Sequence, residues 1–194
     1  KLKGKLAEEF VGEFKRQLEQ IINHCVESSR SYLTPSDIDN IISPDYLTQI
    51  QASNEISQVY LANSLQQGFI YHALNQGVED TAYRVQLVYS YNNQLEVDLL
   101  HQAWQGALIR HPGLRLRFAW ENELVQIVDK TQILDWHFHD LSQQSTIEQQ
   151  QTLEQLIADD RKRGYDLQTG NLLRLYLLKF HTNNYTCIQS NHHA

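Results

Sequence analysis

The spacing of hydrophobic residues changes from a helical to a strand period along this chain, and that change restricts its fold most strongly. From about Lys5 to Glu27, apolar residues recur every three or four positions, which predicts an amphipathic helix. From Ala82 to Tyr91 they alternate with polar residues, which predicts a strand, and the strongly apolar segment Leu172–Phe180 predicts another. Together these segments predict a mixed α/β fold.

Shorter signals place further elements between these segments. Asn63 or Ser64 can cap a helix that runs to about Asn75, with Leu65, Phe69 and His72 on one face. The other expected elements are a helix from Val97 to about His111, a hairpin of Leu114–Trp120 and Leu124–Val128 around Glu121-Asn122, a strand at Leu134–His139, a helix from the capping box of Ser145 and Glu148 to Gly164, and a last strand at Tyr185–Ser190. This order indicates an α/β domain with a mixed sheet.

The segment between Ser28 and about Ile56 is rich in turn and cap residues and contains two of the three prolines. We interpret it as a linker that packs on a surface through Tyr32, Leu33, Ile38, Ile41 and Ile42. A domain boundary is expected within it, so that residues 1–56 form a helix and linker and residues 57–194 form a separate lobe. We expect no strand of the central sheet before about Ile56.

Composition excludes several classes of function. The chain has 194 residues, with 16 Lys and Arg against 23 Asp and Glu and no long basic run, so no nucleic-acid partner is expected. No segment approaches the roughly 20 apolar residues that span a bilayer, so no membrane partner is expected either. Cys25 and Cys187 lie far apart and are interpreted as reduced thiols of a cytoplasmic protein. Because the chain begins with Lys1 rather than Met, we interpret it as a piece of a longer polypeptide.

Two pairs of histidines could carry chemistry. His137 and His139 lie two positions apart on one predicted strand, so their side chains share a face, as two metal ligands would. No third ligand stands at a characteristic spacing, and we therefore expect no metal site. His192 and His193 are adjacent on a strand end and must point to opposite faces. One of them could anchor the structure while the other faces a cavity, but a terminal pair of this kind is also found without any function.

Four segments resemble, in the right order, the motifs of condensation domains from nonribosomal peptide synthetases. Tyr60–His72 resembles their opening motif, Arg110–Phe118 matches R-H-x-x-L-R-x-x-F, Tyr165–Arg174 resembles F-D-L-x-x-G-P-L-L-R with Asn171 in place of the Pro, and Asn191–Ala194 begins H-H-x-x-x-D-G. Each motif alone is modest, whereas the four together are specific for this family.

The first part of the chain resembles the end of an epimerization domain from the same synthetases. His24-Cys25 resembles part of its C-terminal helix, and Tyr32–Ile38, which contains Thr34-Pro35-Ser36-Asp37, resembles its T-P-S-D-F tail. The opening motif, which is closer to the P-M-Q-E-G type, agrees with this. The resemblance implies a condensation domain that follows an epimerization domain and receives a D-configured donor.

The resemblance also implies a fold and a reaction. The fold would be that of chloramphenicol acetyltransferase, with this chain as the N-terminal lobe. The reaction would join two thioesters held on the 4'-phosphopantetheine arms of donor and acceptor carrier proteins. Neighbouring epimerization and adenylation domains would be further partners, and the chain itself would bind no cofactor. Because a second lobe would complete the site, the chain alone is expected to be inactive.

The motifs assign roles to individual residues. His193 would be catalytic, either as general base for the acceptor amine or by holding that amine and stabilising the charge that develops. His192 would be structural. Arg110 or Arg115 would pair with the Asp of the H-H-x-x-x-D-G motif, which lies beyond Ala194.

Two other interpretations of the function stay open. An acyltransferase of the same superfamily that uses coenzyme A thioesters would share the H-H-x-x-x-D-G motif, but the T-P-S-D segment would then be unexplained. A non-catalytic module that docks carrier proteins or neighbouring domains would need none of the catalytic groups.

Overall fold

The structure is a computed structural model that describes residues 4–75, 82–121 and 123–194. Contacts within the chain divide it into two compact units, Lys1–Tyr32 and Leu33–Ala194. The first unit contains one helix, and the second contains two sheets and the remaining helices. Each unit is described by itself.

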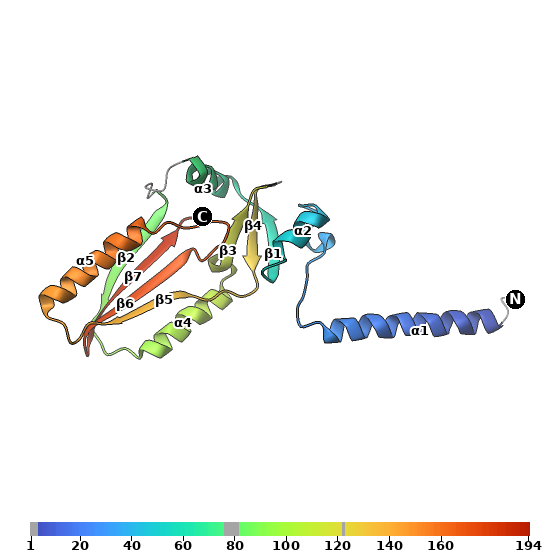
Figure 1. The fold of residues 1–194 in the computed structure, drawn as a ribbon, viewed down its shortest axis with the longest axis horizontal. Coiled ribbons are helices and arrows are strands. Elements are labelled where there is room, and N and C mark those ends of the chain that lie inside the picture. The colour runs from blue at the N-terminus through green and yellow to red at the C-terminus, as the bar shows by residue number, and fades with distance from the viewer. Residues whose placement is uncertain (1–3, 76–81, 122) are drawn as a thin grey trace. The chain divides into compact units, whose positions relative to one another are not determined.

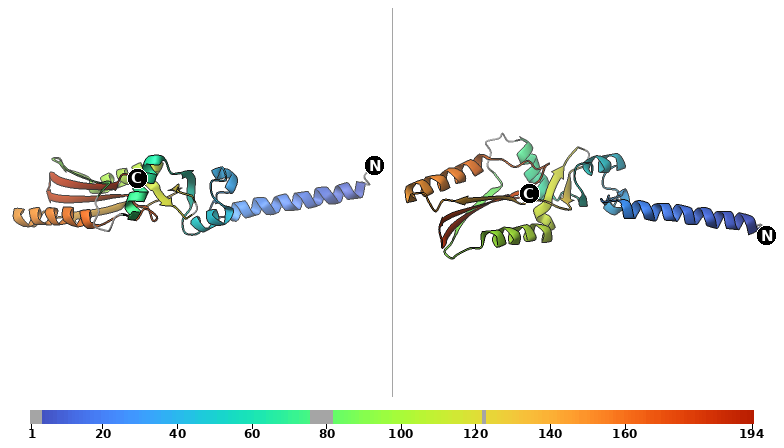
Figure 2. Two further views of the ribbon diagram at one scale, coloured as in Figure 1. Left: turned by 90° about the horizontal axis from the view of Figure 1, so that it is seen from above. Right: turned by 60° about the horizontal axis from the view of Figure 1, so that its bottom comes forward.

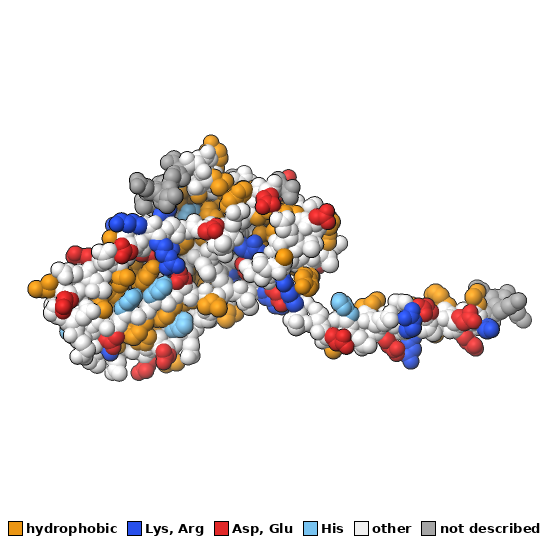
Figure 3. All heavy atoms as spheres, viewed as in Figure 1, with side chains coloured by type: hydrophobic (Ala, Val, Ile, Leu, Met, Phe, Trp, Pro, Cys, Tyr) orange, Lys and Arg blue, Asp and Glu red, His pale blue; other side chains and the backbone are white. Residues whose placement is uncertain are grey.

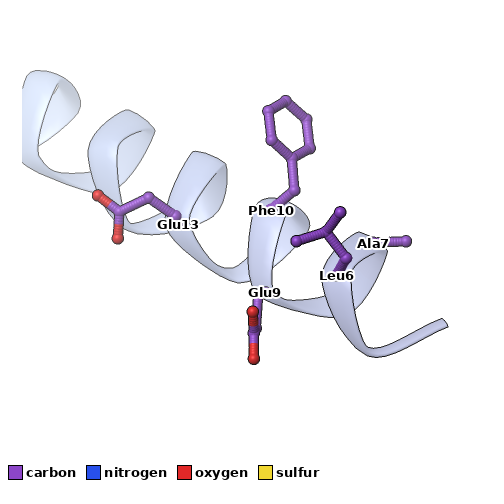
Figure 4. Close-up of a pocket in the computed structure, with 5 residues that line it drawn as sticks. All are labelled: Leu6, Ala7, Glu9, Phe10 and Glu13. Atoms are coloured by element: carbon purple, nitrogen blue, oxygen red, sulfur yellow. The ribbon is translucent and has the colours of Figure 1, made fainter. Parts of the chain in front are cut away.

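The first unit is built on α1 (Gly4–Glu27), which confirms the predicted amphipathic helix. None of its residues is buried, and the apolar stripe is exposed, with Phe10 at 72% and Phe14 at 61%. Figure 4 shows Phe10 and Glu9 pointing to opposite sides of the helix. Most of the stability of an amphipathic helix comes from packing of its apolar face, so this stripe needs a surface to cover it.

A three-stranded antiparallel sheet forms one part of the second unit (Figure 1). Its order is β1 (Ile56–Leu61), β4 (Val125–Asp129) and β3 (Leu116–Ala119). The pairing of β3 with β4 confirms the predicted hairpin, whose turn residue Asn122 lies outside the described residues. Strand β1 was not predicted. It starts at Ile56 and pairs with β4. It is the first strand of the described residues, and the absence of a strand before Ile56 among them agrees with the prediction.

Two short helices cover this small sheet. They are η1 (Pro35–Ile38) and α2 (Pro44–Ile50), and they lie in the segment that was expected to be a linker. The hydrophobic core here contains Ile38, Ile42, Tyr46, Leu47, Ile50, Ile56, Val59, Ala119, Val125 and Ile127. Residues 33–56 therefore pack as an integral part of the second unit. A boundary at residue 56 between two domains of a longer protein stays a prediction.

A four-stranded mixed sheet forms the other part of the second unit. Its order is β2 (Arg84–Tyr91), β7 (Asn184–His192), β6 (Leu173–His181) and β5 (Asp135–Asp140), and only β5 and β6 are parallel. The helices α4 (Val97–Arg110) and α5 (Thr146–Lys162) lie on opposite faces of this sheet (Figure 2). These elements confirm the predicted strands and helices of residues 82–190.

Each face of the four-stranded sheet has its own apolar core. On the α4 side, Leu108 packs with Leu175, Leu177 and Cys187, and Leu100 and Trp104 join them from the same helix. On the α5 side, the core contains Leu141, Tyr176, Leu178 and Ile188, against which Leu153, Leu156 and Ile157 pack. Both faces of the central strand β6 are therefore buried, which explains its nearly continuous apolar sequence.

Local sequence signals start the helices where they were predicted. Ser145 and Glu148 form the capping box of α5, and the side chain of Asn63 accepts a hydrogen bond from the Gln66 amide at the start of α3 (Ser64–Asn75). In α3, Phe69 and His72 contact Tyr83, whereas Leu65 is 65% exposed, so these three residues do not form one buried face.

Candidate active site

One hydrophobic cluster brings together all four sequence motifs. It contains Ile70 from the first motif, Phe118 from the second, Leu167 and Leu172 from the third and Ala194 from the fourth. The backbone reinforces it, because the Phe118 amide donates to the Leu167 carbonyl at 2.7 Å. Segments that lie more than a hundred residues apart in the sequence thus meet beside the two adjacent histidines.

The third motif is a tight turn that only particular residues can form. Gly170 has φ of +83°, and a Cβ at this position would lie 3.3 Å from the Leu116 carbonyl oxygen. Glycine is therefore required both by the backbone conformation and by the close approach to β3. Asn171 follows with φ of +54°, a conformation that Asn tolerates but that the usual Pro of the motif cannot adopt.

His192 is held in place as the last residue of β7. Its backbone amide donates to the Leu172 carbonyl at 3.0 Å, and its Nδ1 accepts a hydrogen bond from the Ala194 amide at 3.1 Å. Burial, together with the nearby charges of Arg84 and His193, lowers the pKa of His192 to about 4. A neutral imidazole is the form that accepts the Ala194 hydrogen bond, so the geometry and the pKa agree.

A buried ion pair packs against Tyr165, whose ring contacts His192. The Tyr165 ring lies edge-on to the His192 ring at 6.0 Å, and the Arg174 guanidinium stacks over Tyr165 at 4.1 Å. Arg174 Nε donates to Asp160 Oδ1 at 3.0 Å, and the two side chains are only 3% and 1% exposed. The roles of these residues were not predicted from the sequence. An arginine inside an apolar strand was the available signal, because a buried charge needs a partner.

His193 lies just beyond the end of β7 and is exposed. Its backbone amide donates to the Tyr83 carbonyl at 2.9 Å, which holds the backbone. The ring centroid lies 6.2 Å from that of Phe69 in α3, and Phe69 in turn contacts Tyr83. The chain thus fixes the His193 backbone while its imidazole stays accessible.

A pocket of about 220 Å³ lies next to the two histidines on the α4 side of the sheet. Its walls are Trp104, Gly113, Leu114, Leu172, Leu173, Gln189, Asn191, His192 and Ala194. Regular alternation along β7 would place Gln189 and Asn191 on the same face as His193. The structure places these two amides in the pocket together with His192, whereas His193 is not among the lining residues.

The two candidate arginines occupy different environments. Arg115 is buried, and its guanidinium donates to the carbonyls of Asp129 at 3.0 Å and Leu108 at 2.5 Å. Arg110 is exposed at the end of α4 and makes no ion pair with any residue that the structure describes. Arg115 therefore fastens α4 to β4, and Arg110 is the candidate whose charge is available.

His137 and His139 both lie on the edge strand β5, but the environments of their side chains differ. His137 Nε2 lies 2.7 Å from Asp135 Oδ1, and its ring stacks on Tyr176. Burial lowers the pKa of His139. Across the described parts of the chain, no group of three or more His, Cys, Asp or Glu is arranged to hold a metal ion. None of the described helices is long and apolar enough to cross a membrane.

Comparison with known proteins identifies the family. The model of the condensation domain matches residues 56–194. The chain therefore belongs to the condensation domain family.

Relatives of this chain are much longer synthases. It is 40% identical over 119 residues to N-(5-amino-5-carboxypentanoyl)-L-cysteinyl-D-valine synthase of Penicillium rubens, a match that covers 60% of this chain and 3% of that protein. It is 32% identical over 187 residues to bacitracin synthase 3 of Bacillus licheniformis, which covers 93% of this chain and 3% of that protein. The chain thus spans a small part of the relatives that it matches.

Solved structures show the same fold. The starter condensation domain of rhizomide synthetase has a TM-score of 0.61 at 19% identity, over 71% of this chain and 34% of that one. A four-domain nonribosomal peptide synthetase bound to AMP and glycine has a TM-score of 0.61 at 17% identity, over 73% of this chain and 10% of that one. These similarities confirm the predicted mixed α/β, chloramphenicol-acetyltransferase-like fold class.

Proposed function

We propose that this chain forms one lobe of a condensation domain that makes an amide bond between two carrier-bound thioesters. The acceptor amine attacks the donor thioester carbonyl, the C–N bond forms, the C–S bond breaks, and the amine proton ends on the released thiol. The meeting of all four motifs beside His192 and His193 is the observation that carries this proposal.

The environments of the two histidines support different roles. His193 is proposed as the catalytic residue, because its imidazole is exposed on a backbone that Tyr83 fixes. It would take the amine proton or hold the amine as charge develops. His192 is proposed as the positioning residue, because its Nδ1 accepts the Ala194 amide and thereby orients the backbone at His193.

The partners follow from the same proposal. Donor and acceptor carrier proteins would present their substrates on 4'-phosphopantetheine, and adenylation and epimerization domains would be neighbours in a cytoplasmic synthetase. The match to bacitracin synthase 3 extends over 93% of the chain, so it includes part of the segment that resembles an epimerization tail. The proposed D-configuration of the donor rests on the resemblance of Tyr32–Ile38 to an epimerization tail.

The 194-residue chain on its own is proposed to be inactive. It aligns with only 34% of the starter condensation domain of rhizomide synthetase. A reaction between two bound thioesters depends on holding both reactants in one geometry, which a single lobe does not supply.

A reconstituted assay tests the proposal against its alternatives. The synthetase that carries this chain is mixed with an acceptor carrier protein and one of three donors, namely a D-aminoacyl carrier, an L-aminoacyl carrier or an aminoacyl coenzyme A. We expect peptide from the D-configured carrier donor and the least from coenzyme A. Transfer from coenzyme A alone would support the acyltransferase alternative, and no transfer from any donor would support a docking module.

A further inference from the structure

A second, polar pocket lies on the opposite face of the four-stranded sheet. Its volume is about 330 Å³, and it is lined by Arg84 and Gln86 from β2, Ser190 from β7, and Asp160 and Arg161 from the end of α5. Figure 3 shows basic side chains, with acidic ones among them, near this end of α5. Three elements that are distant in sequence build the pocket, so it is part of the folded core rather than of one loop.

Among the described residues that line this pocket, the one acidic residue, Asp160, is already neutralised. Asp160 Oδ1 accepts from Arg174 at 3.0 Å, and Asp160 Oδ2 accepts from Gln86 at 2.8 Å. Both oxygens are therefore occupied, and the Arg174–Asp160 pair is almost completely buried. The negative charge of Asp160 is matched by Arg174 and leaves the other two arginines unbalanced.

Arg84 and Arg161 use only part of their hydrogen-bonding capacity. Arg84 Nη1 donates to the Arg161 carbonyl at 3.2 Å, and Arg161 Nε donates to Gln86 Oε1 at 2.8 Å. Within the described residues, neither guanidinium forms an ion pair, and Arg84 Nη2 and both Nη atoms of Arg161 have no acceptor. The chain as a whole has a net charge of −7. This pocket differs from that overall balance because it contains two guanidinium groups that form no ion pair with the described residues.

We propose that this pocket binds a phosphate group between Arg84 and Arg161. A tetrahedral anion with several acceptor oxygens can bridge two guanidinium groups, each of which donates from a planar fork. Arg84 is the register partner of His192, so the pocket adjoins the candidate active site from the other side of the sheet. If the proposed function holds, the phosphate would be the phosphodiester of a phosphopantetheine arm, and the other source is free phosphate.

Titration of the 194-residue chain in phosphate-free buffer tests this site without any condensation assay. The probes are inorganic phosphate, 4'-phosphopantetheine and pantetheine, and the backbone amide signals of Gln86 and Ser190 report binding by NMR. We expect saturable shifts with the first two probes and none with pantetheine. If phosphopantetheine binds more tightly than inorganic phosphate, the phosphopantetheine arm is the source of the phosphate group. If the two bind equally, the pocket recognises free phosphate alone.

Substitutions show whether the two arginines are responsible. Arg84→Gln and Arg161→Gln should each weaken phosphate binding about tenfold or more, because each removes a charge-assisted hydrogen bond. Lys162→Gln removes a neighbouring exposed charge that does not line the pocket and should leave binding unchanged. If a Gln variant fails to fold, the corresponding Arg→Lys variant keeps the charge, and we expect it to bind more weakly than the wild type.

The proposal would be overturned by any of three results. They are the absence of saturable phosphate binding, equal binding of pantetheine and phosphopantetheine, and unchanged phosphate affinity in both Gln variants. The last result would mean that the two arginines only fasten α5 to β2. None of these results depends on whether the synthetase forms peptide bonds, so a failure here is distinguishable from a failure of the proposed function.

Discussion

At the scale of single residues, His192 makes the stability of the fold depend on pH. Its pKa is lowered from 6.5 to about 4 in the folded chain. Between these two values the unfolded chain binds a proton at His192 and the folded chain does not. The contribution of His192 to stability is therefore complete above pH 6.5 and is lost as the pH falls toward 4.

Chemical denaturation at a series of pH values measures this effect. We expect the wild type to lose on the order of 2–3 kcal/mol more than His192→Asn between pH 6.5 and pH 4. His181→Asn, at the exposed end of β6, is the matched control and should follow the wild type. Parallel pH curves for the wild type and His192→Asn would show that the imidazole is not held neutral by the fold.

Two arginine–aspartate pairs of equal length but different burial provide a second comparison. Arg174–Asp160 and Arg163–Asp135 are both 3.0 Å long, but Arg174 is 3% exposed and Arg163 is 52% exposed. Arg174→Met should cost about 3–5 kcal/mol, because it leaves a buried carboxylate without its partner. Arg163→Met should cost less than about 1 kcal/mol. Equal losses of unfolding free energy in the two variants would contradict this account of the support behind His192.

At the scale of elements, the turn of the third motif depends on one glycine. Gly170→Ala should destabilise the fold by about 1–3 kcal/mol, because φ is positive and the added Cβ would press on the Leu116 carbonyl. Gly106→Ala, in α4 with open space around it, should instead stabilise by about 0.5–1 kcal/mol. Thermal unfolding of both variants tests the pair, and a stabilising Gly170→Ala would mean that the turn does not constrain this backbone.

The elements that the sequence predicted are those with long, regular patterns. The helix α1 and the strand β2 each keep one periodicity over eight or more residues, and the strand β6 is apolar over most of its length. Strand β1 was not predicted because a bulge between Ile56 and Gln58 shifts its register. As a result, Ile56 and Val59 are buried and the apolar alternation is broken. The helix α2 has seven residues, which is too short to show a period, and it lies in the segment that was interpreted as a linker because of its turn and cap residues.

The candidate site was predictable only in part, for a related reason. The motif resemblance pointed to His192 and His193, because it depends on the order of residues in the sequence. The pairing of Arg174 with Asp160 and of Arg117 with Asp129 depends on which strands and helices pack together. Sequence spacing carries no such information, so the residues that hold the site together were found only in the folded chain.

At the scale of the whole chain, the second unit should fold without the first. Among the described residues, those that form its cores or pack against them begin at Leu33, and residues 38–50 contribute five buried side chains to the core of the small sheet. Arg117 also donates to the Ile50 carbonyl at 3.0 Å. A chain of residues 33–194 should therefore keep the cooperative unfolding of the second unit, and a chain of residues 57–194 should not.

Urea titration of these two truncated chains measures the difference. We expect residues 33–194 to unfold with the same free energy as the second unit of the full chain. The loss of several buried aliphatic and aromatic side chains, each contributing about 2–5 kcal/mol, should leave residues 57–194 unfolded or aggregated. A stable fold for residues 57–194 would show that the small sheet does not need α2.

Under the proposed function, the fold fixes His193 for amide-bond formation and uses His192 to position it. Single-turnover condensation by the synthetase that carries this chain, measured with loaded donor and acceptor carrier proteins, tests this claim most directly. His193→Ala should keep the unfolding midpoint and slow peptide formation by roughly 10²–10⁴. His192→Ala should lower the midpoint, because the Ala194 amide loses its acceptor. Full condensation activity in a folded His193→Ala variant would contradict the claim.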